Sequence, residues 1–159
     1  MRTRSVLKIA AIAIVGTFVL IQLVPYGRDR ANPPVTTEPR WDSPQTRELA
    51  VPACFDCHSN ETAWPWYTSV APFSWLTQRD VDEGRNTLNF STWDRPQSEL
   101  EDIGKVVLEG EMPPWTYTLI HSGAKLSDAE KRALADGLEA TIAASPPIVS
   151  RDGGSSDGD

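Results

Sequence analysis

The chain has 159 residues, of which 40% are hydrophobic, and its formal net charge at neutral pH is −7. One domain is expected at this length, and the acidic balance leaves no basic surface, which excludes a nucleic-acid-binding protein. Because both ends are predicted to lie outside the globular part, only about 98 residues remain for that domain. Domains of this size bury a small core and often depend on a disulfide, a metal or a cofactor.

The N-terminus is predicted to form a single transmembrane helix over residues 5–26. Its sequence is mostly apolar from Ile9 to Val24 and is preceded by three basic residues, Arg2, Arg4 and Lys8. A spanning helix needs roughly 20 residues, and the positive-inside rule keeps this basic end in the cytoplasm. A cleaved signal is the alternative, but the apolar run is long and no small-x-small cleavage site follows it. The rest of the chain is therefore expected on the outer, periplasmic side of the cytoplasmic membrane.

The exported part is more acidic than the whole chain and has non-globular ends. Apart from the three N-terminal basic residues it carries 12 Lys and Arg against all 22 Asp and Glu, a formal charge near −10. Residues 27–45 are polar and proline-rich, which is typical of an extended linker. Residues 144–159 lack an apolar period and are predicted to be a disordered tail. The globular domain is then expected over residues 46–143.

This domain is predicted to be all-α, with long loops and no sheet. A short helix is expected over residues 46–57, with Pro52 at a break or in the first turn, because proline inside a helix removes a hydrogen bond. A second helix is expected over residues 74–88. Two S-x-x-E capping boxes, Ser98–Glu101 and Ser127–Glu130, predict the starts of two more helices. Gly110 is expected to end the first of these.

Both cysteines of the chain lie in one short motif, Cys54-Phe55-Asp56-Cys57-His58. This is C-x-x-C-H, the attachment sequence for c-type haem. Two cysteines three positions apart lie on one side of a helical turn, so each sulfur can add to one vinyl group of the same porphyrin. The histidine that follows is then placed to bind the iron from that side. Covalent haem on Cys54 and Cys57, with His58 as the proximal ligand, is the favoured interpretation.

Other chemistries of paired cysteines fit the sequence less well. A disulfide across two residues closes too short a loop to stabilise the chain much. A structural zinc ion needs about four ligands, and the chain has only two cysteines and two histidines, with His121 far from His58. A thioredoxin-type dithiol belongs in a βαβ context, which is not predicted here.

The second axial ligand of the iron is predicted by elimination to be Met112. Haem iron takes His, Met, Cys or Tyr, and Met112 is the only methionine besides the initiator. It stands in Gly110-Glu111-Met112-Pro113-Pro114, where the prolines prevent a helix and hold the segment rigid. His121 is the less favoured alternative and is expected at the surface or near a haem propionate.

An aromatic run follows the motif: Trp64, Trp66, Tyr67, Phe73 and Trp75. Large aromatic side chains dominate the cores of small domains, so these rings are expected in the core or in the haem pocket, without a role assigned to any one of them. Arg79 and Arg85 could each pair with a haem propionate, but solvated helix positions are the favoured expectation for both.

Three blocks of the sequence, CFDCHSNETAWPWYTSVAPFSWL, DVDEGRNTLNFSTW and GEMPPWTYTLIHSGAKLSDAEK, resemble a bacterial family of membrane-anchored haem-binding domain proteins. The resemblance covers residues 33 to about 138. It implies a small cytochrome c-like domain with one haem behind one N-terminal helix. By position it implies attachment at Cys54 and Cys57, His58 as proximal ligand, and blocks that contain Met112 and His121. The long aromatic insertion after His58 departs from the general cytochrome c plan.

The function expected from these features is one-electron transfer by a single covalent haem c, without enzymatic activity. The alternative is a haem-based sensor or gas-binding module with a labile distal site. A peroxidase would need an acid–base group beside an open iron, and only His121 is available for that role. The redox partners and the potential do not follow from the sequence.

Overall fold

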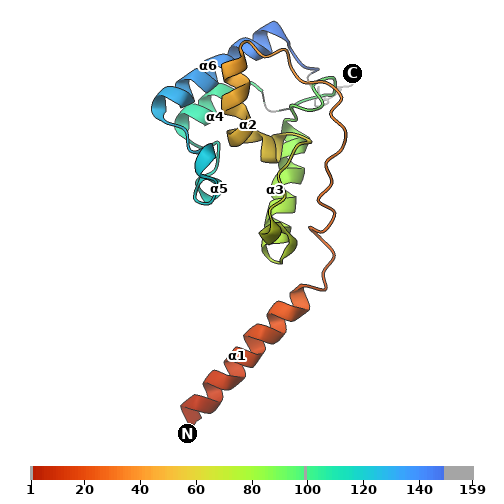
Figure 1. Ribbon diagram of the computed structural model, residues 1–159, viewed down its shortest axis with the longest axis vertical. Coiled ribbons are helices and arrows are strands. Elements are labelled where there is room, and N and C mark those ends of the chain that lie inside the picture. Colours follow the sequence, from red (N-terminus) through yellow and green to blue (C-terminus); the bar gives the residue numbers. More distant parts are fainter. Residues whose placement is uncertain (1, 99, 149–159) are drawn as a thin grey trace, which may run out of the picture. The chain divides into compact units, whose positions relative to one another are not determined.

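The computed structural model describes residues 2–98 and 100–148 and confirms the all-α fold (Figure 1). An isolated bridge joins Thr37 and Thr92, and none of the described residues is assigned to an extended strand. The α-helices are α1 (Arg2–Ile21), α2 (Pro44–His58), α3 (Phe73–Thr87), α4 (Ile103–Glu109), α5 (Trp115–Thr118) and α6 (Asp128–Ala144). Two 3-10 helices, η1 (Trp66–Ser69) and η2 (Ser122–Ala124), lie in the loops.

The chain divides into two compact units. The first consists of the chain up to Ala31 together with Ala63–Asp80, and the second consists of Asn32–Thr62 together with the chain from Val81 onwards. The first unit therefore contains α1 and the aromatic run. The second contains the cysteine motif, Met112 and every residue of the hydrophobic core described below.

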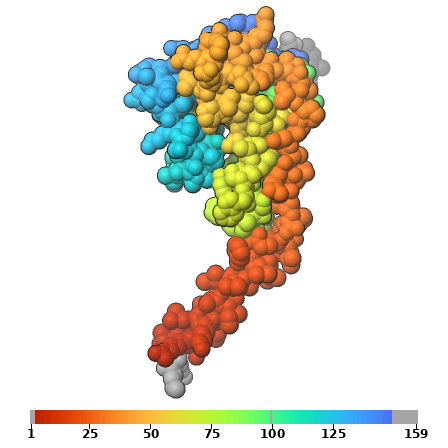
Figure 2. Space-filling model, viewed as in Figure 1, coloured from red at the N-terminus to blue at the C-terminus, as the bar shows by residue number. Residues whose placement is uncertain are grey.

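Helix α1 is long and apolar enough to cross a membrane, and its apolar side chains are exposed (Figure 2). It ends at Ile21, earlier than the predicted residue 26. The amides of the next three residues bond to carbonyls three positions back, which tightens the final turn. Pro25 explains this end, because a proline disfavours helical backbone in the residue before it.

Helix α2 carries the cysteine motif and begins at Pro44, two residues before the predicted start. Ser43 caps it by accepting a hydrogen bond from the Thr46 amide, and Pro44 occupies a first-turn position where a missing N–H costs nothing. The prediction that Pro52 stands at a break or in the first turn was wrong, because the helix continues through it to His58. The buried face of α2 outweighs the one hydrogen bond that Pro52 cannot donate.

The two predicted capping boxes had different outcomes. The Ser127–Glu130 box is confirmed, since both of its reciprocal hydrogen bonds are present at the start of α6. The Ser98–Glu101 box was wrong: α4 begins only at Ile103, and the Ser98 hydroxyl donates instead to the carbonyl of Thr87. Gly110 does end α4, with a left-handed φ of 77°.

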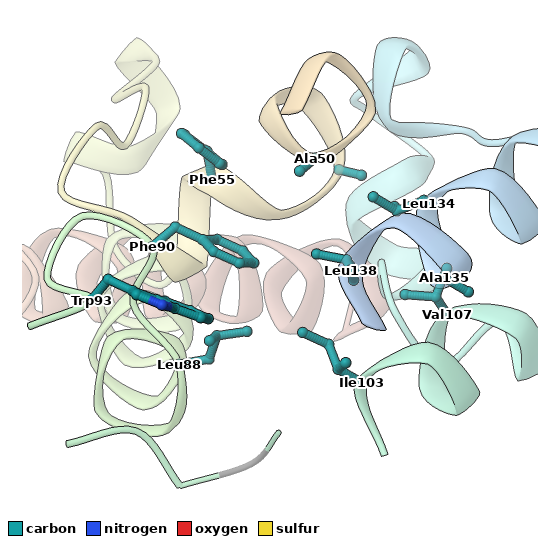
Figure 3. Close-up of a cluster of buried hydrophobic side chains, with 11 residues drawn as sticks. Ala50, Phe55, Leu88, Phe90, Trp93, Ile103, Val107, Leu134, Ala135 and Leu138 are labelled. Carbon is teal, nitrogen blue, oxygen red and sulfur yellow. The ribbon is translucent and has the colours of Figure 1, made fainter. Parts of the chain in front are cut away.

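The core of the second unit is built from α2, α4, α6 and the segment that follows α3 (Figure 3). Helix α6 packs against α4 and α2 (Figure 1). The Phe55 and Phe90 rings stack at 5.7 Å between centroids, and Phe90 and Trp93 at 6.0 Å. These three rings, with Trp41 at their edge, form the aromatic core of the unit.

Both segments predicted to be non-globular are partly held by this core. The Thr36 amide donates to Ser91 O, and the Trp93 amide donates to Thr37 O, so the second half of the proline-rich stretch 27–45 is bonded to the domain. At the other end, Trp93 Nε1 donates to Ser145 O. The remainder of the predicted disordered tail, residues 149–159, lies outside the described residues.

Candidate functional site

The C-x-x-C-H motif occupies the last turn of α2, and its two cysteines are half-buried and not joined in a disulfide. Burial raises the pKa of the Cys54 thiol to about 12, and the neighbouring Cys57 adds to the shift. Among residues 2–98 and 100–148, no three or more His, Cys, Asp or Glu side chains gather as they would around a bound metal ion.

One cavity of about 480 Å³ brings together Cys54, His58 and Met112. Most of its remaining wall is apolar, formed by Ala53, Leu88, Phe90, Ile103, Val106, Val107 and Leu138. Leu88 and Phe90 approach from one side and Ile103 and Leu138 from the other (Figure 3). The polar part of the wall comprises Thr87, Ser98, Glu101, Asp102 and Glu111. Its volume lies in the range of about 300–1,000 Å³ that is usual for cofactor and small-molecule sites.

The orientation of the His58 ring is set by the segment that follows α3. His58 Nδ1 lies 3.1 Å from Leu88 O. Because a carbonyl oxygen can only accept, Nδ1 carries the proton, and the lone pair is on Nε2, the nitrogen that can bind a metal. The Phe90 amide also donates to His58 O at 2.8 Å, so the backbone of the histidine is held from the same segment.

A buried polar network keeps this segment in place. Asn89 stands between the two contacts to His58, and its side chain donates to Asn60 Oδ1 at 2.9 Å and accepts from the Ser91 amide at 2.9 Å. Its own amide donates to Gln97 Oε1 at 2.8 Å. Asn60, Asn89, Ser91 and Gln97 are all buried. Such partners fix the orientation of a metal-binding histidine. This network was not predicted from the sequence, although DVDEGRNTLNFSTW, one of the blocks on which the resemblance rests, contains part of it.

Helix α3 passes very close to the end of α2. A Cβ atom on Gly84 would lie 2.5 Å from Cys57 O and 3.0 Å from Cys57 Cβ, so only glycine fits there. One residue later, Arg85 donates to Ser59 O at 2.7 Å and to the Thr62 hydroxyl at 2.9 Å. The expectation of a solvated Arg85 was wrong, because the guanidinium holds the chain just after the motif.

Met112 is placed by the end of α4. The amides of Glu111 and Met112 both donate to Val106 O, at 2.9 and 3.1 Å. The Met112 side chain contributes to the cavity wall and is 38% exposed. As expected from its prolines, the segment is not helical, and α5 begins only at Trp115.

His121 is placed differently. Its ring stacks on Tyr117 at 3.9 Å between centroids, and its Nδ1 lies 3.0 Å from Tyr117 O. Tyr117 in turn donates to Asp56 Oδ2 at 2.6 Å, which ties α5 to the motif helix. Among the described residues, those that line the cavity do not include His121.

The aromatic run also has a different place from the expected one. All five of its rings belong to the first unit, and none of them is among the described residues that line the cavity. Trp66 is 79% exposed and Phe73 is 57% exposed, so these side chains are not core residues. The aromatic core of the second unit instead uses Trp41, Phe55, Phe90 and Trp93, which the sequence analysis did not identify because they are widely separated in the chain.

Comparison with known families identifies the class of protein. The model of the haem-binding domain family matches residues 16–140, which include the motif, Met112 and His121. The chain therefore belongs to the haem-binding domain family and binds haem. No curated protein and no solved structure gives a significant match to the chain.

The residues of the cavity fit a haem. A haem needs a large apolar enclosure, which the wall of the cavity supplies. It also needs axial ligands, and an imidazole with its lone pair on Nε2 and a thioether are both in the wall. His58, Met112 and Cys54 are therefore the residues that would hold the haem in this cavity, and Cys57 lies three positions from Cys54 on the same helix.

Proposed function

We propose that the chain is a membrane-anchored monohaem c-type cytochrome that carries single electrons and is not an enzyme. The observation that carries this proposal is the cavity whose wall contains Cys54, His58 and Met112 together. In this proposal, the S–H of Cys54 and of Cys57 each adds across one vinyl group. Sulfur bonds to the carbon next to the ring and the hydrogen goes to the terminal carbon, so no oxidant is consumed.

The bound haem would supply a one-electron iron couple, and the chain would determine its access and potential. His58, oriented through Leu88 O, would bind the iron from the motif side. Met112 would supply the second iron ligand, and a thioether raises the potential relative to a second histidine. The apolar wall would exclude water, whereas the carboxylates of Glu101, Asp102 and Glu111 in the wall would favour the oxidised, more positive iron.

The anchor in this proposal is α1, which would span the cytoplasmic membrane once, with the haem domain on the periplasmic side. Its support is an apolar helix whose mean hydropathy is 2.0 over Thr3–Ile21 and whose start is basic. Redox partners are proposed to present a basic surface, because the exported part is acidic. Intact mass of the mature protein tests the anchor, and a chain that starts near residue 28 would contradict it.

The attachment is tested by denaturing electrophoresis with a haem stain. Wild-type protein should keep its haem through denaturation, and the variant with Cys54→Ala and Cys57→Ala should lose all of it. A wild-type chain that releases its haem on denaturation would contradict covalent attachment while leaving haem binding intact.

A second candidate is a haem-based sensor or gas-binding module, and the 38% exposure of Met112 favours it. Carbon monoxide separates the two functions. An electron carrier should bind it slowly or not at all when reduced, should show a weak far-red absorption band of iron–methionine ligation when oxidised, and should lose both properties in Met112→Ala. His121→Ala is the matched control and should behave like wild type. Immediate carbon monoxide binding by the wild type would instead establish the sensor.

A further inference from the structure

The stretch Ala63–Gln78, here called the aromatic segment, has a composition unlike the rest of the chain. Its 16 residues include no charged side chain, whereas the chain as a whole is 23% charged. It contains three of the six tryptophans, together with Tyr67 and Phe73. The segment takes no part in the cavity wall formed by the described residues, so the haem site does not explain this composition.

Several of its large apolar side chains are exposed. Trp66 is 79% exposed, Phe73 57% and Leu76 55%. Phe73 and Leu76 are three positions apart in the first turn of α3, which places them on one face of the helix. Three large, exposed apolar side chains within one uncharged stretch mark a surface that contacts something other than water.

Within the first unit, the aromatic segment is attached to the end of α1. Gln22, the residue after α1, forms two hydrogen bonds with Ala71: its Nε2 donates to Ala71 O and its Oε1 accepts from the Ala71 amide, both at 3.0 Å. Arg30 Nη1 donates to the Ser69 hydroxyl at 2.5 Å. A Cβ on Gly27, which has φ of 77°, would lie 2.3 Å from Ser74 O, so the turn after α1 also packs tightly on this segment.

We propose that the aromatic segment is a membrane-interface element whose side chains Trp66, Phe73 and Leu76 insert among the headgroups of the bilayer that α1 spans. This inference rests on the membrane anchor of the proposed function. The 20 residues of α1 extend about 30 Å, close to the thickness of the hydrocarbon layer, so with the basic start of the helix at the cytoplasmic headgroups its last turn lies near the outer headgroup layer. A segment bonded to that end through Gln22 is held at the same depth.

The chemistry of the segment matches that depth. Tryptophan and tyrosine concentrate at membrane interfaces, because their rings are apolar and their N–H and O–H groups still reach polar partners. An uncharged segment can enter the headgroup layer without desolvating a charge. Arg30, which donates to Ser69 of the segment, and Arg28, which donates to the carbonyl of Gln22, are suited to bind lipid phosphate. The continuity of the exposed rings with a membrane helix favours lipid as the partner over another protein.

Photocrosslinking of the full chain with bound haem, in vesicles of equal parts phosphatidylcholine and phosphatidylglycerol, tests the proposal. The photoreactive residue p-benzoylphenylalanine replaces Trp66 in one protein and Phe73 in another, and phospholipid adducts are measured by mass spectrometry. Both positions should form lipid adducts. Adding Gln22→Leu should lower the yield about tenfold, because it removes the two hydrogen bonds to Ala71 and keeps the anchor apolar. Gln45→Leu, the same substitution at an exposed position of α2, should leave the yield unchanged.

The outcomes separate this inference from the proposed function. Chain that stays with the vesicles after a carbonate wash, yet forms no lipid adduct or forms an adduct with another protein, would overturn the interface element and leave the anchor standing. Chain that the wash releases would overturn both the anchor and the inference, without touching haem binding. An unchanged yield in Gln22→Leu would overturn the role of the hydrogen-bonded pair. If Gln22→Leu loses haem, the lipid adducts at positions 66 and 73 in the protein that keeps Gln22 decide whether the segment contacts lipid.

Discussion

In the second unit the rings of Phe55, Phe90 and Trp93 are at most 5% exposed, whereas in the first unit Trp66 and Phe73 are 79% and 57% exposed. Both groups are aromatic, and both lie within 40 residues of the cysteine motif. The difference is in their neighbours. Phe90 stacks between Phe55 of α2 and Trp93, whereas Trp66 and Phe73 belong to a segment that is bonded to the end of α1. A cluster of aromatic residues in a sequence therefore does not by itself locate a core.

The largest effect expected from this comparison is on the free energy of unfolding. Phe90→Ala should lower it by about 3–5 kcal/mol, because it opens a void between rings stacked on both sides. Trp66→Ala, measured in detergent, should change it by no more than about 0.5 kcal/mol, as for other exposed positions. Denaturant titration followed by far-ultraviolet circular dichroism measures both. Similar losses from the two variants would mean that the aromatic run belongs to the core after all.

The second largest loss of stability is expected from disturbing the close packing around the cysteine motif. Gly84→Ala should cost about 3 kcal/mol and reduce the amount of bound haem, because the new Cβ meets the backbone of Cys57. Gly123→Ala is the matched control, since a Cβ there meets nothing within 4 Å. Haem absorbance per mole of chain and the unfolding midpoint report the result. A Gly84→Ala protein with full haem content would show that α3 does not restrain the motif.

The polar network behind His58 should contribute somewhat less to the free energy of unfolding than the close packing at Gly84. Asn89→Ala should lower the free energy of unfolding by about 1–3 kcal/mol, because it leaves buried partners unsatisfied. It should also weaken haem-iron ligation, since partners that orient a metal-binding histidine affect affinity by about 10–100-fold. The midpoint potential, which a purely structural role would not move, is the second measurement. Asn86→Ala, at an exposed position of α3, should change neither quantity.

The smallest change in the free energy of unfolding is expected at the edge of the aromatic core, where Glu38 pairs with Arg47. Arg47 binds both carboxylate oxygens of Glu38 at 2.8 and 2.9 Å, and Trp41 Nε1 donates to the same group at 2.9 Å. The hydrogen bond from Arg47, and after it the one from Trp41, lower the pKa of Glu38 below its ordinary value of 4.5, against an opposing effect of partial burial. Because the pair is partly exposed, Glu38→Gln should cost about 1 kcal/mol or less.

The pH dependence of this effect has a definite sign. A carboxyl group with a lowered pKa in the folded state stabilises the fold above its unfolded-state value, and that stability is lost as the pH falls through the folded value. The difference between wild type and Glu38→Gln should therefore be constant above about pH 5 and vanish in stronger acid. Glu48→Gln, at an exposed position of α2, provides the control. A difference that grew in acid would contradict this account.

The elements that could be predicted from the sequence are those whose partners are close in the chain. The Ser127–Glu130 box formed because both of its hydrogen bonds join residues three apart. The similar box at Ser98 failed because its hydroxyl finds Thr87, eleven residues away, in the folded chain. Pro52 was misjudged for the same kind of reason, since packing of the buried face of α2 outweighs one missing hydrogen bond. Local rules hold until a distant group offers a better partner.

The sequence by itself identified the C-x-x-C-H motif and the apolar first helix, because both depend only on residue type and short spacing along the chain. Only the tertiary structure decided that Met112 is in the wall of the cavity that His58 enters, that His121 stacks on Tyr117 instead, and that the aromatic run belongs to the first unit. It also decided that Leu88 and Asn89, thirty residues from the motif, hold His58 in place. Burial and buried hydrogen bonds depend on which distant segments pack together, and that information is absent from any short stretch of the chain.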